Sequence, residues 1–224
     1  MDRVKTNISG FDDLIDGGIP RGSSVLLSGP CGAGKVYFAS EFLYKGAEPS
    51  IYYAFEQSQE SMKENLSVFN WDMDKAIKGK QFNIIQSELY QFESFLSDLE
   101  DNIEKTGAAR VVVDSLTVIG EFFDSPYKLR KSLLELKRMV KNNDATAILL
   151  SETPANTDKL STFGSEEFVL DGVILLHLIK SQTELNHAVS VRKMIGTNFA
   201  STIHPFEIRN TGLKVHKIRE LRGL

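Results

Sequence analysis

The sequence predicts an α/β fold: a mostly parallel sheet with helices on both faces and antiparallel strands appended at the C-terminal side. Two observations carry this prediction. Up to Gly164, short apolar runs alternate with segments of helical periodicity, and strands that are apolar on both faces are typical of parallel sheets covered by helices. Beyond Gly164, two long apolar segments follow each other across a short polar connection, which favours antiparallel pairing.

One domain, residues 1–224, is expected, because the chain shows no long linker, low-complexity segment or internal repeat. Its net charge of −4 gives no overall attraction to nucleic acid. No apolar run approaches the ~18 residues of a membrane span, and the first residues lack a signal-peptide pattern, so no membrane partner is expected. The single cysteine, Cys31, excludes an intrachain disulfide and fits a cytoplasmic location.

The chain opens with a turn-rich segment, in which we expect a short helix over residues 11–15 with Ser9 as its N-cap. The strands of the parallel part are expected at the apolar and β-branched runs Ser24–Ser28, Ser50–Phe55, Phe82–Ile85, Arg110–Ser115 and Ala147–Leu150. Helices are expected at Tyr37–Lys45, from Ser58 onward, along the stripe Leu89, Phe92, Leu96, Leu99 and Ile103, and along the stripe Leu129, Leu133, Leu136 and Val140.

The last third of the chain is expected to supply the antiparallel strands. Val169–Lys180 and Leu185–Met194 form one pair, joined by residues 181–184. Ile203–Ile208 and Leu213–Val215 form a second, shorter pair around the turn residues 210–212.

A glycine-rich stretch between the first strand and the next helix has the pattern G-x-x-x-x-G-K. In this context the backbone N–H groups, the helix N-terminus and the lysine charge together form a cradle for phosphate groups, so ATP or ADP is the expected ligand. The alternative is a turn that binds nothing. Cys31 is either a reactive thiol or a tolerated loop residue. The expected nucleotide-binding residues are Gly29, Pro30, Cys31, Gly32, Ala33, Gly34, Lys35, Val36 and Tyr37.

Two carboxylates follow buried strands and are expected to face the loop. Asp114 is the candidate for holding nucleotide-bound Mg²⁺, usually through water; otherwise it caps the following helix. Glu56 is the candidate for accepting a hydrogen bond from the water that attacks the γ-phosphate; otherwise it caps the helix near Ser58. Gln57 can orient water but cannot take its proton.

Two basic segments, Lys128–Lys141 and Lys214–Arg219 with Arg222, leave nucleic-acid binding open. A solvated helix face is the favoured interpretation, because aromatic residues are not interleaved with the charges of the first segment. Trp71 is expected to be a packing residue. The four histidines, His177, His187, His204 and His216, lack metal-ligand spacing, so no zinc site is expected.

Several stretches form a set with the glycine-rich loop. They are Ser9–Leu14, Gly17–Gly22, Gly29–Lys35, Phe55–Ser58, Val111–Ser115, Leu170–Ile174, Arg192–Thr197 and His204–Phe206. Together they resemble the KaiC-like group of RecA-superfamily ATPases, which includes many archaeal proteins of RadA type. The resemblance implies a single RecA-type domain that binds ATP and assembles into hexamers with nucleotide at the subunit interface. It also implies that Lys35 grips the phosphates, that Asp114 is the Walker B acid and that Glu56 is the first residue of the catalytic Glu-Glu pair.

Three residues depart from the family pattern. Val36 replaces the metal-binding Thr or Ser of a Walker A loop, which is therefore degenerate, and Gln57 replaces the second glutamate. Ile195 replaces an arginine that reaches a neighbouring subunit's nucleotide, whereas Lys193 of the same motif is retained as a candidate catalytic residue. An arginine of this kind is worth ~10³–10⁵ in rate, so these changes weaken hydrolysis more than binding.

The expected function is therefore ATP binding with slow or lost hydrolysis, in a nucleotide-dependent regulator or scaffold with a weakened Mg²⁺ site. A homo-oligomer is expected from the resemblance, and a protein partner stays open. One alternative is an active Mg²⁺-dependent ATPase. A second is an accessory protein of recombination that binds single-stranded DNA.

Overall fold

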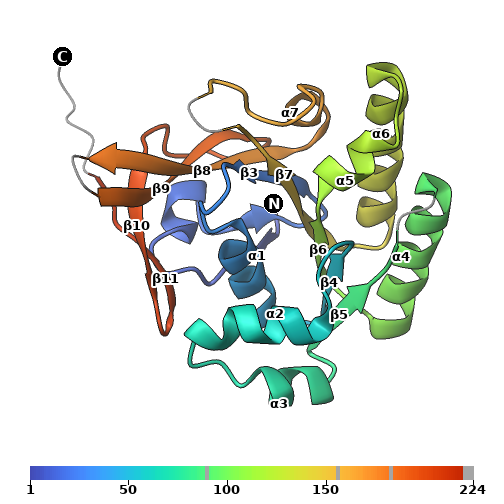
Figure 1. Cartoon of the computed structure of the whole chain (residues 1–224), viewed down its shortest axis with the longest axis horizontal. Coiled ribbons are helices and arrows are strands. Elements are labelled where there is room, and N and C mark those ends of the chain that lie inside the picture. Colours follow the sequence, from blue (N-terminus) through green and yellow to red (C-terminus); the bar gives the residue numbers. More distant parts are fainter. Residues whose placement is uncertain (89–90, 155–156, 182–183, 219–224) are drawn as a thin grey trace.

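A nine-stranded sheet in the order β11-β10-β9-β8-β3-β7-β6-β4-β5 forms the centre of the molecule (Figure 1). The computed structural model describes residues 1–88, 91–154, 157–181 and 184–218. Six neighbouring strands, from β8 to β5, run parallel to one another, and β9, β10 and β11 continue the sheet in antiparallel fashion. The expected fold class is confirmed.

The parallel strands coincide with the apolar runs of the sequence. Their alternate residues enter two hydrophobic clusters on opposite faces, so that Val25 and Leu27 face one cluster and Leu26 faces the other. In a strand that is buried on both faces, apolar residues cannot alternate with polar ones. Continuous apolar runs therefore predicted these strands. Their bounds are β3 Ser24–Gly29, β4 Ser50–Ala54, β5 Phe82–Gln86, β6 Arg110–Asp114, β7 Thr146–Glu152 and β8 Gly172–Ser181.

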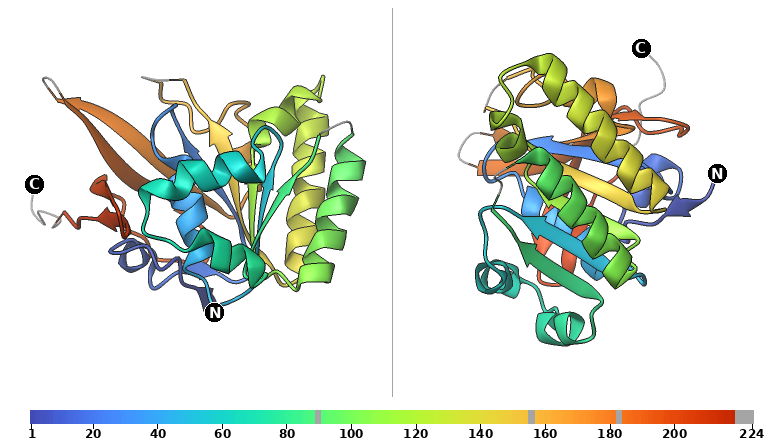
Figure 2. Two further views of the ribbon diagram at one scale, coloured as in Figure 1. Left: turned by 60° about the horizontal axis from the view of Figure 1, so that its bottom comes forward. Right: turned by 90° about the vertical axis from the view of Figure 1, so that its right-hand side faces the viewer.

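Helices cover both faces of the parallel part (Figure 2). On one face lie α1 Lys35–Tyr44, α2 Gln59–Asn65 and α3 Met73–Lys78, with the short helix η2 Leu66–Val68 between the last two. On the other face lie α4 Phe92–Thr106 and α6 Pro126–Asn142. The short helices α5 Leu116–Glu121 and α7 Glu166–Val169 complete the set within the described residues.

The antiparallel extension consists of β9 Glu184–Met194, β10 His204–Arg209 and β11 Gly212–Val215. One predicted boundary was wrong: residue Val169 ends helix α7, and the strand starts only at Gly172. The Leu170 N–H donates to the Glu166 carbonyl, which closes a helical turn before the chain can join the sheet.

The N-terminal segment forms a two-stranded sheet of β1 Arg3–Val4 and β2 Ile19–Pro20 around the short 3₁₀ helix η1 Asp12–Ile15. Ser9 does not cap this helix, which has no side-chain cap; Ser9 instead bridges to Lys214. The Asp12 carboxylate organises the turn by accepting hydrogen bonds from the Thr6 hydroxyl, 2.7 Å, and the backbone N–H groups of residues 6 and 7.

Several expected features lie outside the described residues, namely Leu89, the middle of the 181–184 connection, Arg219 and Arg222. The remaining members of the first helical stripe confirm α4, because Phe92, Leu99 and Ile103 are buried. Over the described residues, no helix has the length and apolarity needed to cross a membrane.

Candidate functional site

The glycine-rich loop joins β3 to α1 in the middle of the sheet, where the carboxyl ends of β7, β3 and β8 meet. Gly32 and Gly34 have φ angles of +78° and +91°, which side chains with a Cβ rarely adopt. The first N–H groups of α1 have no acceptor within the helix, because the residues four positions earlier lie in the loop. The backbone therefore has the form of the expected phosphate cradle.

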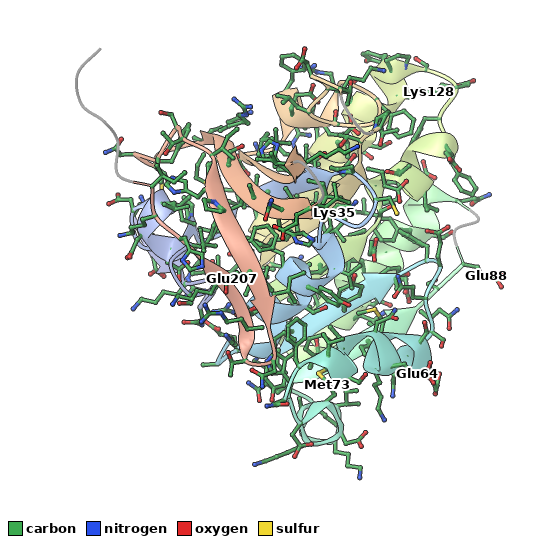
Figure 3. All side chains as sticks on the ribbon, turned by 60° about the vertical axis from the view of Figure 1, so that its left-hand side comes forward. Lys35, Glu64, Met73, Glu88, Lys128 and Glu207 are labelled. Carbon is green, nitrogen blue, oxygen red and sulfur yellow. The ribbon has the colours of Figure 1, made fainter. Side chains whose placement is uncertain are left out.

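Lys35, labelled in Figure 3, is the first residue of α1. The amine donates hydrogen bonds to the carbonyl oxygens of Gly29, 2.8 Å, and Pro30, 3.1 Å. Burial lowers the pKa of the Lys35 amine, and the nearby charges of Glu152 and Asp114 oppose this shift. A partly buried cation thus lies where an anionic ligand would meet the loop.

Asp114 ends β6, two strands away from the loop strand. The buried Tyr52 hydroxyl donates a 2.7 Å hydrogen bond to its carboxylate. Burial raises the pKa of Asp114, and the Lys35 charge counteracts the rise. The peptide bond between Asp114 and Ser115 is cis. Because Ser115 occupies the N-cap of α5, the helix-cap alternative for Asp114 is wrong.

Glu56 follows β4 with an exposed side chain. The preceding residue is hydrogen-bonded to Asp114, because the Phe55 N–H donates to the Asp114 carbonyl oxygen, 3.1 Å. The alternative role as a helix cap is wrong, because Ser58 caps α2 by accepting the N–H of Ser61, 3.2 Å. The amide oxygen of Gln57 accepts a hydrogen bond from Asn65.

Glu152 is a site residue that sequence reasoning missed. It ends β7 in register with Gly29 at the start of the loop. Burial lowers the pKa of Lys35 and raises that of Asp114; the negative charge of Glu152 opposes the first shift and adds to the second. The available signal was the same one that singled out Asp114, a carboxylate at the end of a buried strand, but the sequence alone did not place β7 beside the loop strand.

A magnesium ion would find few protein ligands here. Within the described ranges, no three His, Cys, Asp or Glu side chains are grouped so that they could hold a metal ion. Mg²⁺ bound to a nucleotide usually keeps several waters and needs only one or two carboxylates besides the phosphates. The oriented carboxylate of Asp114 fits that role, whereas Val36 offers no oxygen.

The side chains after Lys35 pack toward the protein interior. Val36 and Tyr37 contact the hydrophobic cluster beneath α1, and the Tyr37 ring meets the Phe69 ring edge to face, 5.2 Å between centroids. Cys31, by contrast, is exposed. Of the expected loop residues, the glycines and Lys35 therefore shape the cradle, whereas Val36 and Tyr37 anchor α1.

Lys193 lies at the other end of the sheet. It pairs with Val173 near the start of β8, whereas the loop follows the end of β3, which runs parallel to β8. Its amine donates to the carbonyl oxygens of Glu167, 3.0 Å, and Leu170, 2.7 Å, at the end of α7. The structure does not bring Lys193 to the loop of its own chain, and Ile195 next to it is 54% exposed.

Trp71 and the basic residues of α6, which the sequence left as candidates for ligand binding, are engaged in packing contacts and ion pairs. Trp71 stacks between the rings of Tyr44 and Phe69, at 4.6 and 4.1 Å between centroids, which confirms packing. In the basic helix α6, Lys137 pairs with Asp171, 2.7 Å, and Lys128 pairs with Asp124, 2.9 Å. These partners neutralise part of the charge that would attract nucleic acid.

A family model described as the KaiC ATPase matches residues 4–220, nearly the whole described fold. The chain belongs to the KaiC family. Members of this family are RecA-fold proteins that bind nucleotide and Mg²⁺ and form oligomers. The match confirms the resemblance inferred from the loop and its associated stretches.

Individual relatives cover the chain almost completely. A UPF0273 protein of Methanocaldococcus jannaschii is 35% identical over 99% of this chain and 100% of its own length. The circadian clock oscillator protein KaiC of Synechococcus elongatus is 29% identical over 98% of this chain, which spans 45% of that protein. The crystal structure of a KaiC-like protein from Pyrococcus horikoshii superposes with a TM-score of 0.87 at 36% identity, covering 96% of this chain and 99% of that one.

Proposed function

We propose that this KaiC-family protein binds ATP or ADP at the loop Gly29–Val36 and hydrolyses ATP slowly or not at all, acting as a nucleotide-dependent regulator or scaffold. One observation carries the proposal. The parts of the site that recognise phosphates, namely the glycine backbone and the Lys35 amine, are complete, whereas Val36 offers no hydroxyl for the metal.

On nucleotide binding, the Lys35 amine would exchange the carbonyl oxygens of Gly29 and Pro30 for phosphate oxygens. Its present partners are neutral carbonyls, whereas phosphate oxygens carry negative charge and add a coulombic attraction to the hydrogen bond. The exchange therefore favours an anionic ligand. A magnesium ion would be held by the phosphates and, through water, by Asp114, so the metal site is weaker than one that also has a Ser or Thr hydroxyl.

For hydrolysis, we assign Glu56 the role of orienting the attacking water, because its side chain is exposed and it follows Phe55, whose N–H donates to the Asp114 carbonyl oxygen. Lys193 would act only on the nucleotide of a neighbouring copy, since it lies far from its own loop. With Ile195 in place of the family's arginine, such an oligomer, a hexamer by family resemblance, lacks one transition-state charge.

The test is nucleotide binding measured by titration calorimetry, with ATP and ADP, in Mg²⁺ and in EDTA. We expect submillimolar affinity and no phosphate release over hours. Lys35→Ala should weaken binding by about tenfold or more, because it removes a charge-assisted contact. Lys78→Ala, on the exposed end of α3, is the matched control. A wild-type protein without measurable affinity for either nucleotide would overturn the proposal.

The second candidate is a working ATPase, which the position of Glu56 near Asp114 favours. Phosphate release that Glu56→Gln abolishes would establish it. Binding of single-stranded DNA would require salt-sensitive affinity that is lost when Lys131 and Lys137 are changed; the pairing of Lys137 with Asp171 argues against this function.

A further inference from the structure

The outer side of the phosphate loop is covered by β8 and by the antiparallel extension of the sheet. A Cβ on Gly32 would lie 3.6 Å from the Leu178 side chain of β8. A Cβ on Gly34 would lie 3.6 Å from the Phe206 side chain and 3.7 Å from the Ile208 side chain, both on β10. The backbone of both left-handed glycines therefore lies next to side chains of these strands, with room for little more than a Cβ between them.

His187 of β9 makes the polar contact in this wall. Its Nε2 atom lies 3.1 Å from the carbonyl oxygen of Gly32. A carbonyl oxygen can only accept, so Nε2 carries the proton in this hydrogen bond. The bond links residues 155 positions apart in the chain, and it joins the extension directly to the loop that receives the ligand.

The peptide group between Gly32 and Ala33 is consequently held at both ends. Its carbonyl oxygen accepts from His187, and its N–H, on Ala33, donates to the Pro30 carbonyl, 3.2 Å. The Pro30 carbonyl also accepts from the Lys35 amine. Rotation of this peptide group would break the His187 contact and disturb the turn that carries Lys35.

The imidazole of His187 is itself held in place. Its ring packs against the Phe206 ring, with 5.3 Å between centroids and an interplanar angle of 45°. Phe206 is buried, and β10 pairs with both β9 and β11. Side chains that are locked by packing can hold a ligand-binding loop in its productive shape before the ligand arrives.

We propose that His187 is a positioning residue for nucleotide binding, which fixes the Gly32–Ala33 peptide group so that the phosphate loop is preorganised. The inference rests on the proposed nucleotide binding, because it assigns a further determinant to the same site. His187 does not touch the ligand in this proposal; it acts through the loop backbone.

The test compares His187→Ala with His187→Gln, whose amide N–H₂ can still donate to the Gly32 carbonyl. ADP affinity of the Ala variant, measured in EDTA by calorimetry, should fall about three- to tenfold, the value of one hydrogen bond. The Gln variant should stay within about twofold of wild type, since it retains the donor. Asn186→Ala, an exposed neighbour on β9, is the control and should bind as wild type does.

Amide hydrogen exchange of the unliganded protein gives an independent measurement. The Ala33 amide should exchange faster in His187→Ala than in wild type or His187→Gln, while amides of β3 keep their protection. Unchanged ADP affinity and unchanged Ala33 exchange in a folded His187→Ala protein would overturn the inference. If the wild type does not bind ADP but His187→Ala still speeds exchange of the Ala33 amide, the proposed function alone would be overturned.

Discussion

The backbone and the side chains of the phosphate loop have separable tasks. Gly32 and Gly34 provide the left-handed turns, and Lys35 provides the cation. Val36 has the shape of threonine without its hydroxyl, and its partly buried side chain contacts the core below α1. The loop therefore keeps its fold without the hydroxyl, and under the proposed function the site has one magnesium ligand fewer.

Restoring the hydroxyl gives a prediction about a single residue. Val36→Thr should tighten ATP binding in Mg²⁺ by about three- to tenfold, because a hydroxyl ligand contributes on the scale of one polar contact. Binding in EDTA should not change, since the phosphate cradle is the same. Calorimetry in both buffers measures the difference. Equal affinities of variant and wild type in Mg²⁺ would show that the metal is held without this position.

Two residues of the site could not be found in the sequence for a geometric reason. Glu152 acts through the register that sets it beside Gly29, and His187 acts through a contact between β9 and the loop. Both relations depend on strand order, which local patterns do not encode. Lys35 was predictable because it belongs to a short motif with its own chemistry, and Asp114 because it ends a buried β-branched run.

At the scale of elements, the strands and the short helices η1 and α2 were predicted from the sequence, whereas periodicity predicted neither α3 nor α5. Continuous apolar runs predicted β3, β4, β6 and β7, because a central strand buries both of its faces. Helices α3 and α5 have six residues each, too few for a 3.6-residue period to be recognised. The early start predicted for β8 failed because apolar Val169 belongs to a helical turn.

A buried carboxylate fastens the β10–β11 hairpin to α1. Glu41 is fully buried and accepts the N–H of Leu213, 2.6 Å, and the amine of Lys45, 2.5 Å. Gly212 has a φ of +123°, which residues with a Cβ rarely adopt, and a Cβ there would lie 2.5 Å from the Glu41 carboxylate, so this position favours glycine. The same hairpin carries Phe206, which packs against His187. The contacts of Glu41 with this hairpin therefore help to hold the strands that pack against the phosphate loop.

The stability of the protein should depend on pH through the buried carboxyl of Glu41. Burial holds the pKa of Glu41 above its ordinary value of 4.5. The carboxyl therefore contributes stability below its unfolded pKa, and that contribution is lost as the pH rises through its folded pKa. Glu41→Gln keeps an acceptor for Leu213 without the charge, so its free energy of unfolding relative to wild type should increase from about pH 4 to pH 8.

Urea unfolding of both proteins across this range measures the effect. Glu64→Gln, an exposed position on α2, is the control and should leave the pH profile of stability unchanged. A constant difference between Glu41→Gln and wild type at all pH values would contradict the prediction.

For the whole molecule, the parallel strands keep two groups of candidate site residues apart. The loop, Asp114, Glu56 and Glu152 gather at the carboxyl ends of the parallel strands, whereas Lys193 and Ile195 lie where β8 begins. Residues near opposite ends of the parallel strands cannot contact the same nucleotide within one chain. Completion of the site by Lys193 therefore requires a second copy that presents this end to the loop.

The last prediction follows from that separation. In an oligomer, Ile195→Arg would supply the missing cation to a neighbour's nucleotide, and Val36→Thr would supply the missing metal ligand within the chain. Because the two changes act on different parts of the same transition state, the double variant should hydrolyse ATP faster than either single variant, by about tenfold or more if the arginine acts as such residues do elsewhere. Phosphate release and light scattering are measured on the same samples. A monomeric double variant with rapid turnover would contradict the assignment, since Ile195 is too far from its own loop to act there.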